Sequence, residues 1–518
     1  MKKFFSNSLI VSIFLFLSKL LGFVRDLLLA SFFGSGSALQ AFLVAFRFPE
    51  FMRKVTSSGV LTQIVNPYLD GNANDKNKNK NKKFIITVLY FIALLLLIIT
   101  VVAIVFSNIW VEVYAYGLVD DSNTLSLVRS MFVIMIPYLL FNGVMGVISA
   151  VLNSYSKYLI SSILPIVLNI VMIIGIIISP RFSIPIFSVA YAVLLAGVIQ
   201  VAIGGYSLIK LIGKFKLDKG IVLVKDVRAR TFLKRLPSAF FGTAILQING
   251  LIETFFASFL LSGSLAWLYY ADRVNQFLYG VFGTAIATVM IPYLISCKKD
   301  KQKFFQTLGL IIRFTLIVTV PAVVGLLILA KPVVISLFFY GRFSLQDVDF
   351  TYLAMLGYLV SLFCFVLVRV IVSALYTQNK TSIVFYIGLI CLIITIVADM
   401  IIVNLFVSDD HAFLYLALVS SFVSLLNLFI QLWVLCDLSF RLFIKSYLHF
   451  MTILRITVAS ICMVLVLKSF NLSDSYWITL SMFDRLKSIA LIVCAGVFVY
   501  SVIIIILGGL GSFKELKR

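Results

Sequence analysis

Residues 26–51 read DLLLASFFGSGSALQAFLVAFRFPEF, and residues 253–277 repeat this hairpin as ETFFASFLLSGSLAWLYYADRVNQF. Both copies have Ala-Ser-Phe before the turn and Ser-Gly-Ser at the turn, and Pro-Tyr-Leu follows at 67–69 and at 292–294. Because the shared letters are not only aliphatic, chance does not account for a match of this length. The sequence therefore predicts two related lobes.

Both copies of the hairpin place ionisable residues inside apolar helices. An acid opens each copy (Asp26 and Glu253), and an arginine follows each turn (Arg47 and Arg273). A charge at the centre of a membrane helix costs about 2.5–3.5 kcal/mol on insertion scales, so such residues rarely face lipid. Duplicated lobes with intramembrane charges are typical of secondary transporters that bind their substrate centrally.

The composition places the chain in a membrane. Hydrophobic residues make up 62% of the 518 positions and charged residues 12%, against about a quarter charged in soluble domains. Crossing a bilayer as a helix takes about 20 residues, and fourteen apolar runs reach that length, at 8–33, 38–69, 84–106, 125–153, 159–179, 185–212, 237–262, 265–296, 307–330, 348–377, 382–405, 413–435, 450–469 and 485–508. The sequence predicts an all-α integral membrane protein with 14 transmembrane helices.

The formal net charge of +22 follows a topological pattern. Lys and Arg gather in every second loop, at 76–83, 157, 210–235, 298–303, 380, 441–445 and 514–518. This asymmetry follows the positive-inside rule and places both termini in the cytoplasm. The location of the charge argues against a nucleic-acid partner.

The repeat divides the chain into lobes. Spans one to six form an N-lobe at 1–212, and spans seven to twelve form a C-lobe at 237–436. A basic cytoplasmic linker at 213–236 joins them, and 437–518 carries two appended spans and a cytoplasmic tail. Because six is even, both lobes enter the membrane in the same direction, and we expect a pseudo-two-fold axis along the membrane normal.

Spans one, two, seven and eight carry more cations than acids. The cations are Lys19, Arg25, Arg47, Arg53, Lys54 and Arg273, and the acids are Asp26, Glu50, Glu253 and Asp272. We expect these side chains to line a water-filled cavity between the lobes. A cationic cavity suits an anion, and the planar fork of arginine suits the oxygens of a pyrophosphate. The alternative is that the charges pair internally and join the helices.

A second polar group lies in spans seven, eleven and twelve, and consists of Glu253, Thr395, Asp399 and Ser420. Oxygen ligands of this kind bind Na⁺ or a proton in coupled transporters; the alternative is that Asp399 is a buried polar contact. We expect no resident cofactor and no firm metal site, because the six cysteines are scattered without a CxxC pair. The chain also lacks a GxxxxGK[ST] phosphate loop. These features predict a transporter and not an enzyme.

The run LGFVRDLLLASFFGSGSALQAFLVAFRFPEFMRKVTSSGVLTQIVNPYL at 21–69 resembles the start of the MurJ (MviN) family, the lipid II flippases of bacterial peptidoglycan synthesis. WLYYADRVNQF at 267–277 resembles the eighth span of that family, and VLNSYSKY at 151–158 resembles its fourth loop. The resemblance implies the MOP-superfamily fold, which is MATE-like. In that fold two six-helix lobes surround a V-shaped cavity, and spans thirteen and fourteen form a groove for the lipid tail.

The resemblance also implies roles for individual residues. The essential cavity cations of the family correspond to Lys19, Arg25, Arg53 and Arg273, which would bind the substrate, and the cavity would further be lined by Asp26, Gln40, Arg47, Asp272 and Gln276. Lys19 stands where arginine is usual, and Gln40 and Gln276 stand where the family has acids. Lysine keeps the charge but loses bidentate geometry, and the two glutamines remove acidic partners.

These observations predict a lipid II flippase that moves the undecaprenyl-pyrophosphate-linked peptidoglycan precursor from the inner to the outer leaflet of the bacterial cytoplasmic membrane by alternating access. The expected partners are lipid II and membrane lipids, with cell-wall synthesis proteins as further candidates, and the chain is expected to act as a monomer. One alternative is a flippase for another lipid-linked oligosaccharide, of the O-antigen type, or a MATE-like ion-coupled exporter. A membrane-embedded cell-wall polymerase and a scaffold are alternatives of a different class. The short outer loops argue against the polymerase, and the buried cations argue against the scaffold.

Overall fold

The computed structural model describes residues 2–57, 60–69, 75–119, 121–213, 227–297, 299–435 and 450–508. Within these ranges the chain is built of helices and turns, without a β-strand. Ten helices in this part of the chain are long and apolar enough to cross a membrane. The all-α, multi-pass membrane fold is therefore confirmed, and the count of fourteen spans stays a prediction.

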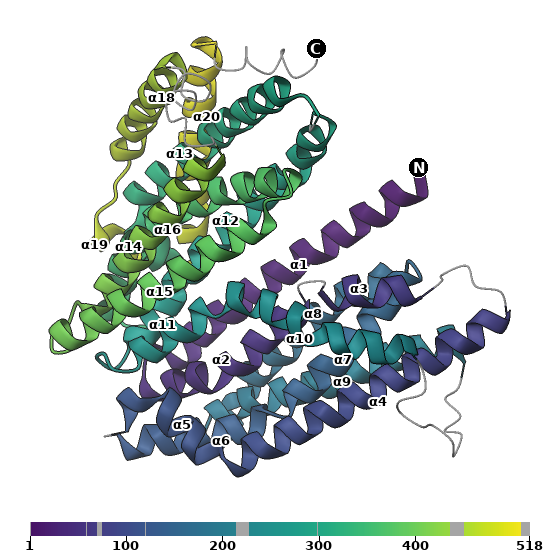
Figure 1. The fold of residues 1–518 in the computed structure, drawn as a ribbon. Helices are drawn as coiled ribbons and strands as arrows, with labels where there is room; N and C mark the ends of the chain where they lie inside the picture. The colour runs from purple at the N-terminus through teal and green to yellow at the C-terminus, as the bar shows by residue number, and fades with distance from the viewer. Residues whose placement is uncertain are drawn as a thin grey trace. The chain divides into compact units, whose positions relative to one another are not determined.

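The chain forms two compact units, Met1–Ala266 and Trp267–Arg518. The long helices of the first unit are α1 (Lys2–Phe33), α2 (Ser37–Ser57), α4 (Asp75–Val105), α6 (Ser122–Met135), α7 (Tyr138–Ser154), α8 (Tyr158–Ile178), α9 (Ile186–Ile212) and α10 (Val227–Gln247), and the short ones are α3 (Val60–Val65), α5 (Ser107–Tyr114) and α11 (Asn249–Ala257). Helix α1 packs against α8, α8 against α9, and α2 against α6 and α7 (Figure 1). These pairs connect the charged helices α1 and α2 to apolar neighbours.

Two expected spans of the first unit are broken. The described part of span two consists of α2, α3 and the 3-10 turn Asn66–Tyr68, and α2 continues through Pro49. Span four is interrupted at Pro137, which precedes α7, because proline lacks the N–H that a continuous helix needs. Span seven is interrupted at Ile248, between α10 and α11. A break leaves backbone carbonyls available to side chains.

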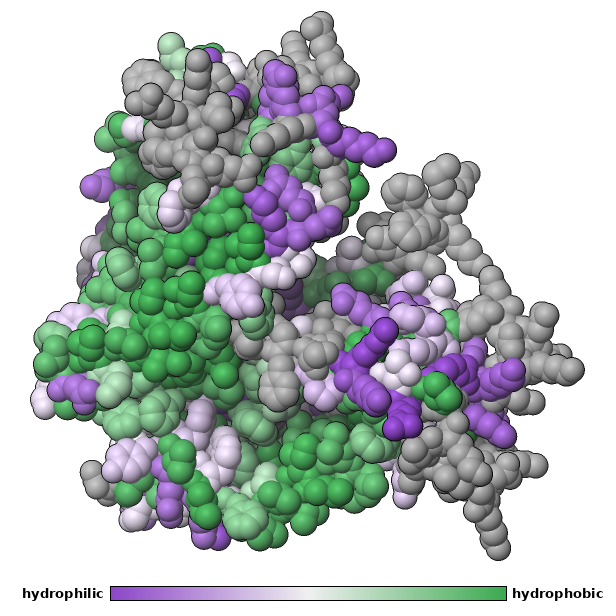
Figure 2. Space-filling model, in the orientation of Figure 1, coloured by the Kyte–Doolittle hydropathy of each residue, from purple (hydrophilic) through white to green (hydrophobic). Residues whose placement is uncertain are grey.

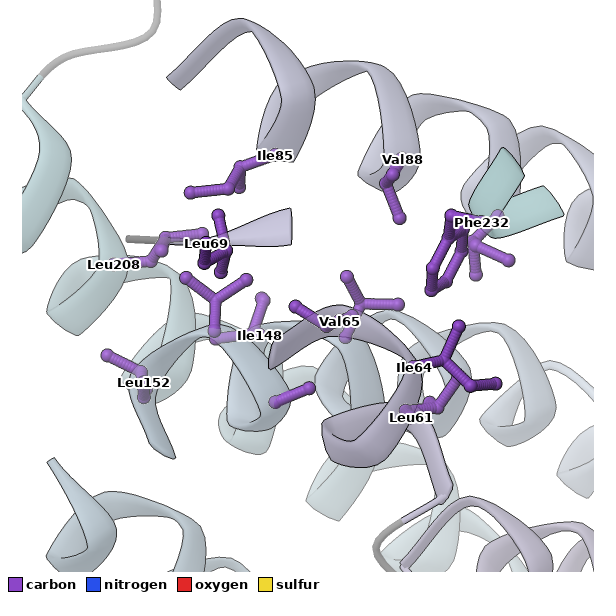
Figure 3. Close-up of a cluster of buried hydrophobic side chains, with 14 of the residues drawn as sticks. Leu61, Ile64, Val65, Leu69, Ile85, Val88, Ile148, Leu152, Leu208 and Phe232 are labelled. Atoms are coloured by element: carbon purple, nitrogen blue, oxygen red, sulfur yellow. The ribbon is translucent and has the colours of Figure 1, made fainter. Parts of the chain in front are cut away.

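A buried apolar cluster holds the α3 end of the first unit together, and Figure 3 shows its side chains pointing toward one another. It contains Leu61, Ile64, Val65 and Leu69 of the α3 segment, Ile85 and Val88 of α4, Ile148 and Leu152 of α7, Leu208 of α9 and Phe232 of α10. The cluster therefore joins five segments that lie far apart in the sequence.

The first turns of α10 are amphipathic. Ala229 and Phe232 are buried against the cluster, and Arg230 and Lys234 are exposed. Of the linker expected at 213–236, residues 227–236 form these turns, and residues 214–226 lie outside the described residues. Helices α10 and α11, which were expected to open the C-lobe, pack in the first unit against α2 and α3. Packing does not test an internal repeat, so the boundaries at 212, 236 and 436 stay predictions.

The second unit contains α12 (Ser264–Ser296, whose first residues belong to the first unit), α13 (Lys301–Phe338), α14 (Leu345–Thr377), α15 (Thr381–Phe406), α16 (Ala412–Leu435), α18 (Phe450–Ser469), α19 (Asp474–Thr479) and α20 (Met482–Ile506). Helix α14 packs against α13 and α16, and α15 packs against α16. Helices α18 and α20 pack against each other and against α13. The two appended spans are thus built onto α13.

A buried arginine fixes the start of α20. Arg485 donates hydrogen bonds to the carbonyls of Trp477 (2.8 Å), Ile478 (2.8 Å) and Phe339 (2.9 Å). Since all three acceptors are backbone atoms, the guanidinium joins α19 and α20 to the residue that follows α13.

Large apolar side chains cover much of the surface, and Figure 2 shows broad hydrophobic areas with hydrophilic residues in separate patches. Val105, Leu405 and Ile506 are among the exposed examples. Apolar patches of this extent are not tolerated in water, so these faces contact lipid.

Candidate functional site

Helix α1 carries two of the predicted substrate ligands, in different surroundings. Lys19 is exposed. Arg25 is only 6% exposed and lies beside Asp26, which is 2% exposed. One carboxylate oxygen of Asp26 accepts from Nε of Arg25 at 2.9 Å and from Nη2 at 2.7 Å. The internal pair considered from the sequence is therefore present.

Helix α8 supplies a further partner to Arg25. Nη1 of Arg25 donates to the side-chain oxygen of Asn169 at 3.1 Å and lies 3.7 Å from the sulfur of Met172. The amide nitrogen of Asn169 donates to the carbonyl of Ser18 at 2.9 Å. Asn169 was not among the predicted site residues, although it is the one amide in the apolar run YLISSILPIVLNIVMIIGIII.

The charges of α2 surround a single carboxylate. Glu50 is 3% exposed, and its oxygens lie 3.5 Å from Arg47, 3.7 Å from Arg53 and 3.6 Å from Lys54. The spacings of three and four residues place these side chains on one helix face. Three cations around one acid leave this face with a net positive charge.

Arg47 also reaches the broken seventh span. Its Nε donates to the carbonyl of Gly250 at 2.8 Å, and its Nη2 lies 3.8 Å from Glu253. Thr254 donates its hydroxyl to the same carbonyl at 2.9 Å, and Tyr114 donates to the carbonyl of Leu251 at 3.1 Å. Side chains from α2 and α5 thus satisfy the backbone next to the break.

Gln40, which stands where the family has an acid, is 1% exposed. Its side-chain oxygen accepts from the hydroxyl of Ser262 at 3.3 Å. The neutral amide therefore joins α2 to the turn that precedes α12, without adding charge to this buried position.

In the second unit, Arg273 is held by residues of its own helix. Its guanidinium lies over the ring of Tyr269, 4.4 Å from the centroid, and Nη1 donates to the oxygen of Gln276 at 3.2 Å. The nitrogen of Gln276 donates to Asp272 at 2.5 Å. Gln276, the second position where the family has an acid, therefore bridges the acid and the arginine of this helix.

The four residues of the predicted ion site are divided between the two units and have different partners. Glu253 belongs to the first unit and is paired with Arg47. In the second unit, Asp399 and Thr395 are buried on α15, and the hydroxyl of Thr395 donates to the carbonyl of Cys391 at 3.0 Å. The carbonyl of Ser420 accepts from Ser424 at 2.7 Å. Among the described residues, no group of three or more His, Cys, Asp or Glu could hold a metal ion.

Sequence comparisons identify relatives across most of the chain. The family described as "Lipid II flippase MurJ" matches residues 29–487. A "Probable lipid II flippase MurJ" of Buchnera aphidicola subsp. Schizaphis graminum is 30% identical over 509 residues, which cover 96% of each chain. A protein of the same name from Vibrio cholerae is 30% identical over 437 residues, which cover 82% of each chain.

Solved structures share the fold. "Lipid II flippase MurJ, inward closed conformation" matches with a TM-score of 0.78 at 23% identity, over 98% of this chain and 100% of the other. An inward-facing multidrug resistance MATE family transporter of the MOP superfamily matches with a TM-score of 0.65 at 14% identity, over 81% of this chain and 95% of the other. The MOP-type architecture is therefore confirmed. With the family matched over residues 29–487 and relatives covering nearly the whole chain, this protein belongs to the lipid II flippase (MurJ) family.

Proposed function

We propose that this protein moves lipid II, the undecaprenyl-pyrophosphate-linked peptidoglycan precursor, from the inner to the outer leaflet of the bacterial cytoplasmic membrane. Membership of the lipid II flippase family supports this proposal. The observation that carries its chemistry is the surplus of cations over acids on apolar helices, since a region with net positive charge suits an anionic substrate.

The pyrophosphate is the part of lipid II that the cations recognise. Lys19, Arg25, Arg53 and Arg273 are its proposed ligands. Exposed Lys19 supplies charge, and arginine guanidinium groups supply paired N–H donors that match phosphate oxygens. Because Asp26 occupies one edge of the Arg25 guanidinium, a bound pyrophosphate would compete with it there. The undecaprenyl tail would remain in the lipid.

Transport would proceed by alternating access, in which one arrangement of the lobes opens to the cytoplasm and the other opens outward. Both termini would lie in the cytoplasm, as the loop charges require. The protein would act as a monomer, and cell-wall synthesis proteins would be its partners.

The energy for the cycle would come from an ion or from the membrane potential. Glu253, Thr395, Asp399 and Ser420 are the proposed ligands for Na⁺ or a proton. Moving one elementary charge through 100 mV is worth about 2.3 kcal/mol, so the cavity cations themselves would also respond to the potential. Varying the Na⁺ gradient and the potential separately in vesicles distinguishes these two sources.

The second candidate substrate class is another lipid-linked oligosaccharide, whose pyrophosphate would satisfy the same cations. A cationic drug is disfavoured because drug exporters need an acidic cavity and this one is basic. Depleting the protein and identifying the lipid-linked precursor that accumulates decides between the substrates. Accumulation of lipid II supports the proposal, and accumulation of a different lipid-linked sugar with unchanged lipid II overturns it.

A further inference from the structure

Asn169 lies between a group that only donates hydrogen bonds and a group that only accepts them. Arg25 offers only N–H donors, and the carbonyl of Ser18 offers only acceptor lone pairs. The side-chain amide of Asn169 satisfies both, with its oxygen 3.1 Å from Nη1 of Arg25 and its nitrogen 2.9 Å from the Ser18 carbonyl. Because the partners have opposite requirements, the orientation of the amide is forced.

The packing of α1 against α8 makes this contact close. Gly22 lies on the α1 face between Ser18 and Arg25, and a Cβ atom built on Gly22 would lie 3.4 Å from the nitrogen of Asn169. The amide of Asn169 therefore packs in van der Waals range of the α1 backbone at Gly22. Asn169 itself is buried, at 7% exposed.

Three hydrogen bonds fix the plane of the Arg25 guanidinium from two sides. Asp26 accepts from Nε and Nη2, and Asn169 accepts from Nη1 on the opposite edge. A bidentate contact between a guanidinium and a phosphate group needs that plane in a defined orientation. An arginine side chain without such partners loses more rotamer entropy when it binds a ligand.

We propose that Asn169 is a positioning residue for lipid II transport, which orients the Arg25 guanidinium for the substrate pyrophosphate. This inference rests on the proposed role of Arg25. Asn169 need not touch the substrate. Asn169 links Arg25 to the Ser18 carbonyl of α1, the helix that carries Arg25. Arg25 would therefore keep its orientation when the substrate pyrophosphate displaces Asp26.

Two substitutions of Asn169 distinguish its bond to Arg25 from its bond to the Ser18 carbonyl. Asn169→Leu removes both bonds at similar volume, and we expect lipid II binding in nanodiscs to weaken about tenfold, the range for a hydrogen bond to a charged group. Asn169→Asp keeps the acceptor but loses the donor to Ser18 and places a second carboxylate on Arg25. We expect it to weaken binding as well, because two acids then compete with the pyrophosphate.

Gln200→Leu is the matched control. Gln200 is also buried; its amide nitrogen donates to the carbonyl of Leu164 on α8 at 2.7 Å, and its oxygen accepts from the hydroxyl of Tyr138 at 3.5 Å. Because neither bond goes to Arg25, losing both should leave lipid II binding within about twofold of that of the unchanged protein. Melting temperature in detergent shows whether each variant remains folded.

The decisive measurement is a double-mutant cycle with Arg25→Lys. If Asn169 acts through Arg25, Asn169→Leu should change lipid II binding less than about twofold in the Arg25→Lys background, against about tenfold in the original one. An equal effect in both backgrounds would overturn the inference, because Asn169 would then act through helix packing. If Arg25→Ala abolishes binding while both Asn169 variants bind normally, only this inference fails. If the Arg25→Ala variant binds lipid II normally, both this inference and the proposed role of Arg25 are wrong.

Discussion

Lys19 and Arg25 lie on the same helix but differ in exposure and in the geometry of the charge that an anion would meet. Lys19 is exposed, and a lysine ammonium acts as a compact point charge. Arg25 is buried and held by side chains on two edges. At the residue scale, α1 therefore combines an exposed ammonium with a buried guanidinium whose orientation is fixed.

The first prediction concerns Lys19. Lys19→Arg should support growth of cells depleted of their own flippase, because it keeps the charge, and Lys19→Gln should not. Complementation, with membrane abundance checked by immunoblot, measures this. A Lys19→Gln variant that complements fully would show that the charge at this position is not needed.

The second prediction concerns Glu50, the carboxylate that three cations of α2 share. Glu50→Gln leaves three half-buried cations without their shared buried acid, and breaking a buried ion pair costs about 3–5 kcal/mol. We expect a clear fall in melting temperature in detergent. Glu253→Gln is the control with a smaller expected fall, since Arg47 retains Glu50 as a partner. Equal melting temperatures for Glu50→Gln and the unchanged protein would contradict the account.

Sequence spacing predicted the local contacts among charges and missed the distant ones. The i,i+3 and i,i+4 positions on α2 already indicated that Glu50 meets Arg47, Arg53 and Lys54. Nothing in the spacing of α1 pointed to Asn169, because that contact depends on how α8 packs against α1. Arg47 and Gly250 are likewise brought together only by tertiary packing.

At the scale of elements, the seventh span is divided where a side chain of α2 reaches its backbone. Leu251 donates its N–H to the carbonyl of Ile248 at 2.8 Å. The two residues are three apart, which is the spacing of a 3-10 turn and not of an α-helix. Two residues after the break, Arg47 donates to the carbonyl of Gly250 at 2.8 Å. A Cβ atom at Gly250 would lie 2.7 Å from Nη2 of Arg47, so the guanidinium would have to shift to make room for it.

The third prediction follows from this contact. Gly250→Ala should displace Arg47 from the carbonyl and lower the melting temperature, although alanine is the better helix former by about 1 kcal/mol. Gly205→Ala on α9 is the matched control, because a Cβ atom there would meet nothing within 4 Å. It should leave the melting temperature unchanged or raise it. If Gly250→Ala behaves like Gly205→Ala, Arg47 does not hold the break.

The apolar runs of the sequence predicted where helices occur, and not where they are interrupted. Runs such as 185–212 and 382–405 correspond closely to α9 and α15. Span seven, expected as one run at 237–262, is divided at Ile248, and α10 begins within the expected linker at Val227. Hydrophobicity reports burial in lipid or protein, whereas the break depends on side chains from other helices and the early start of α10 depends on the apolar cluster of Figure 3.

At the scale of the whole molecule, the repeated hairpin predicted the transporter fold before any coordinates, because duplication and intramembrane charge together are typical of that class. The sequence could not predict the division of contacts at Ala266, because that division depends on which helices pack together. The roles of Lys19, Arg25, Arg53 and Arg273 remain a prediction, and they are the centre of the functional account.

Flipping of labelled lipid II by the purified protein in vesicles tests the proposed roles of these cations most directly. The unchanged protein should move lipid II across the bilayer, and Arg25→Ala, Arg53→Ala and Arg273→Ala should each reduce the rate at least about tenfold, the loss expected when a charge-assisted bond to the substrate is removed. Arg342→Ala, which removes an exposed arginine of the loop between α13 and α14, should flip at the unchanged rate. Flipping by all three cavity variants at the rate of the unchanged protein would contradict the account.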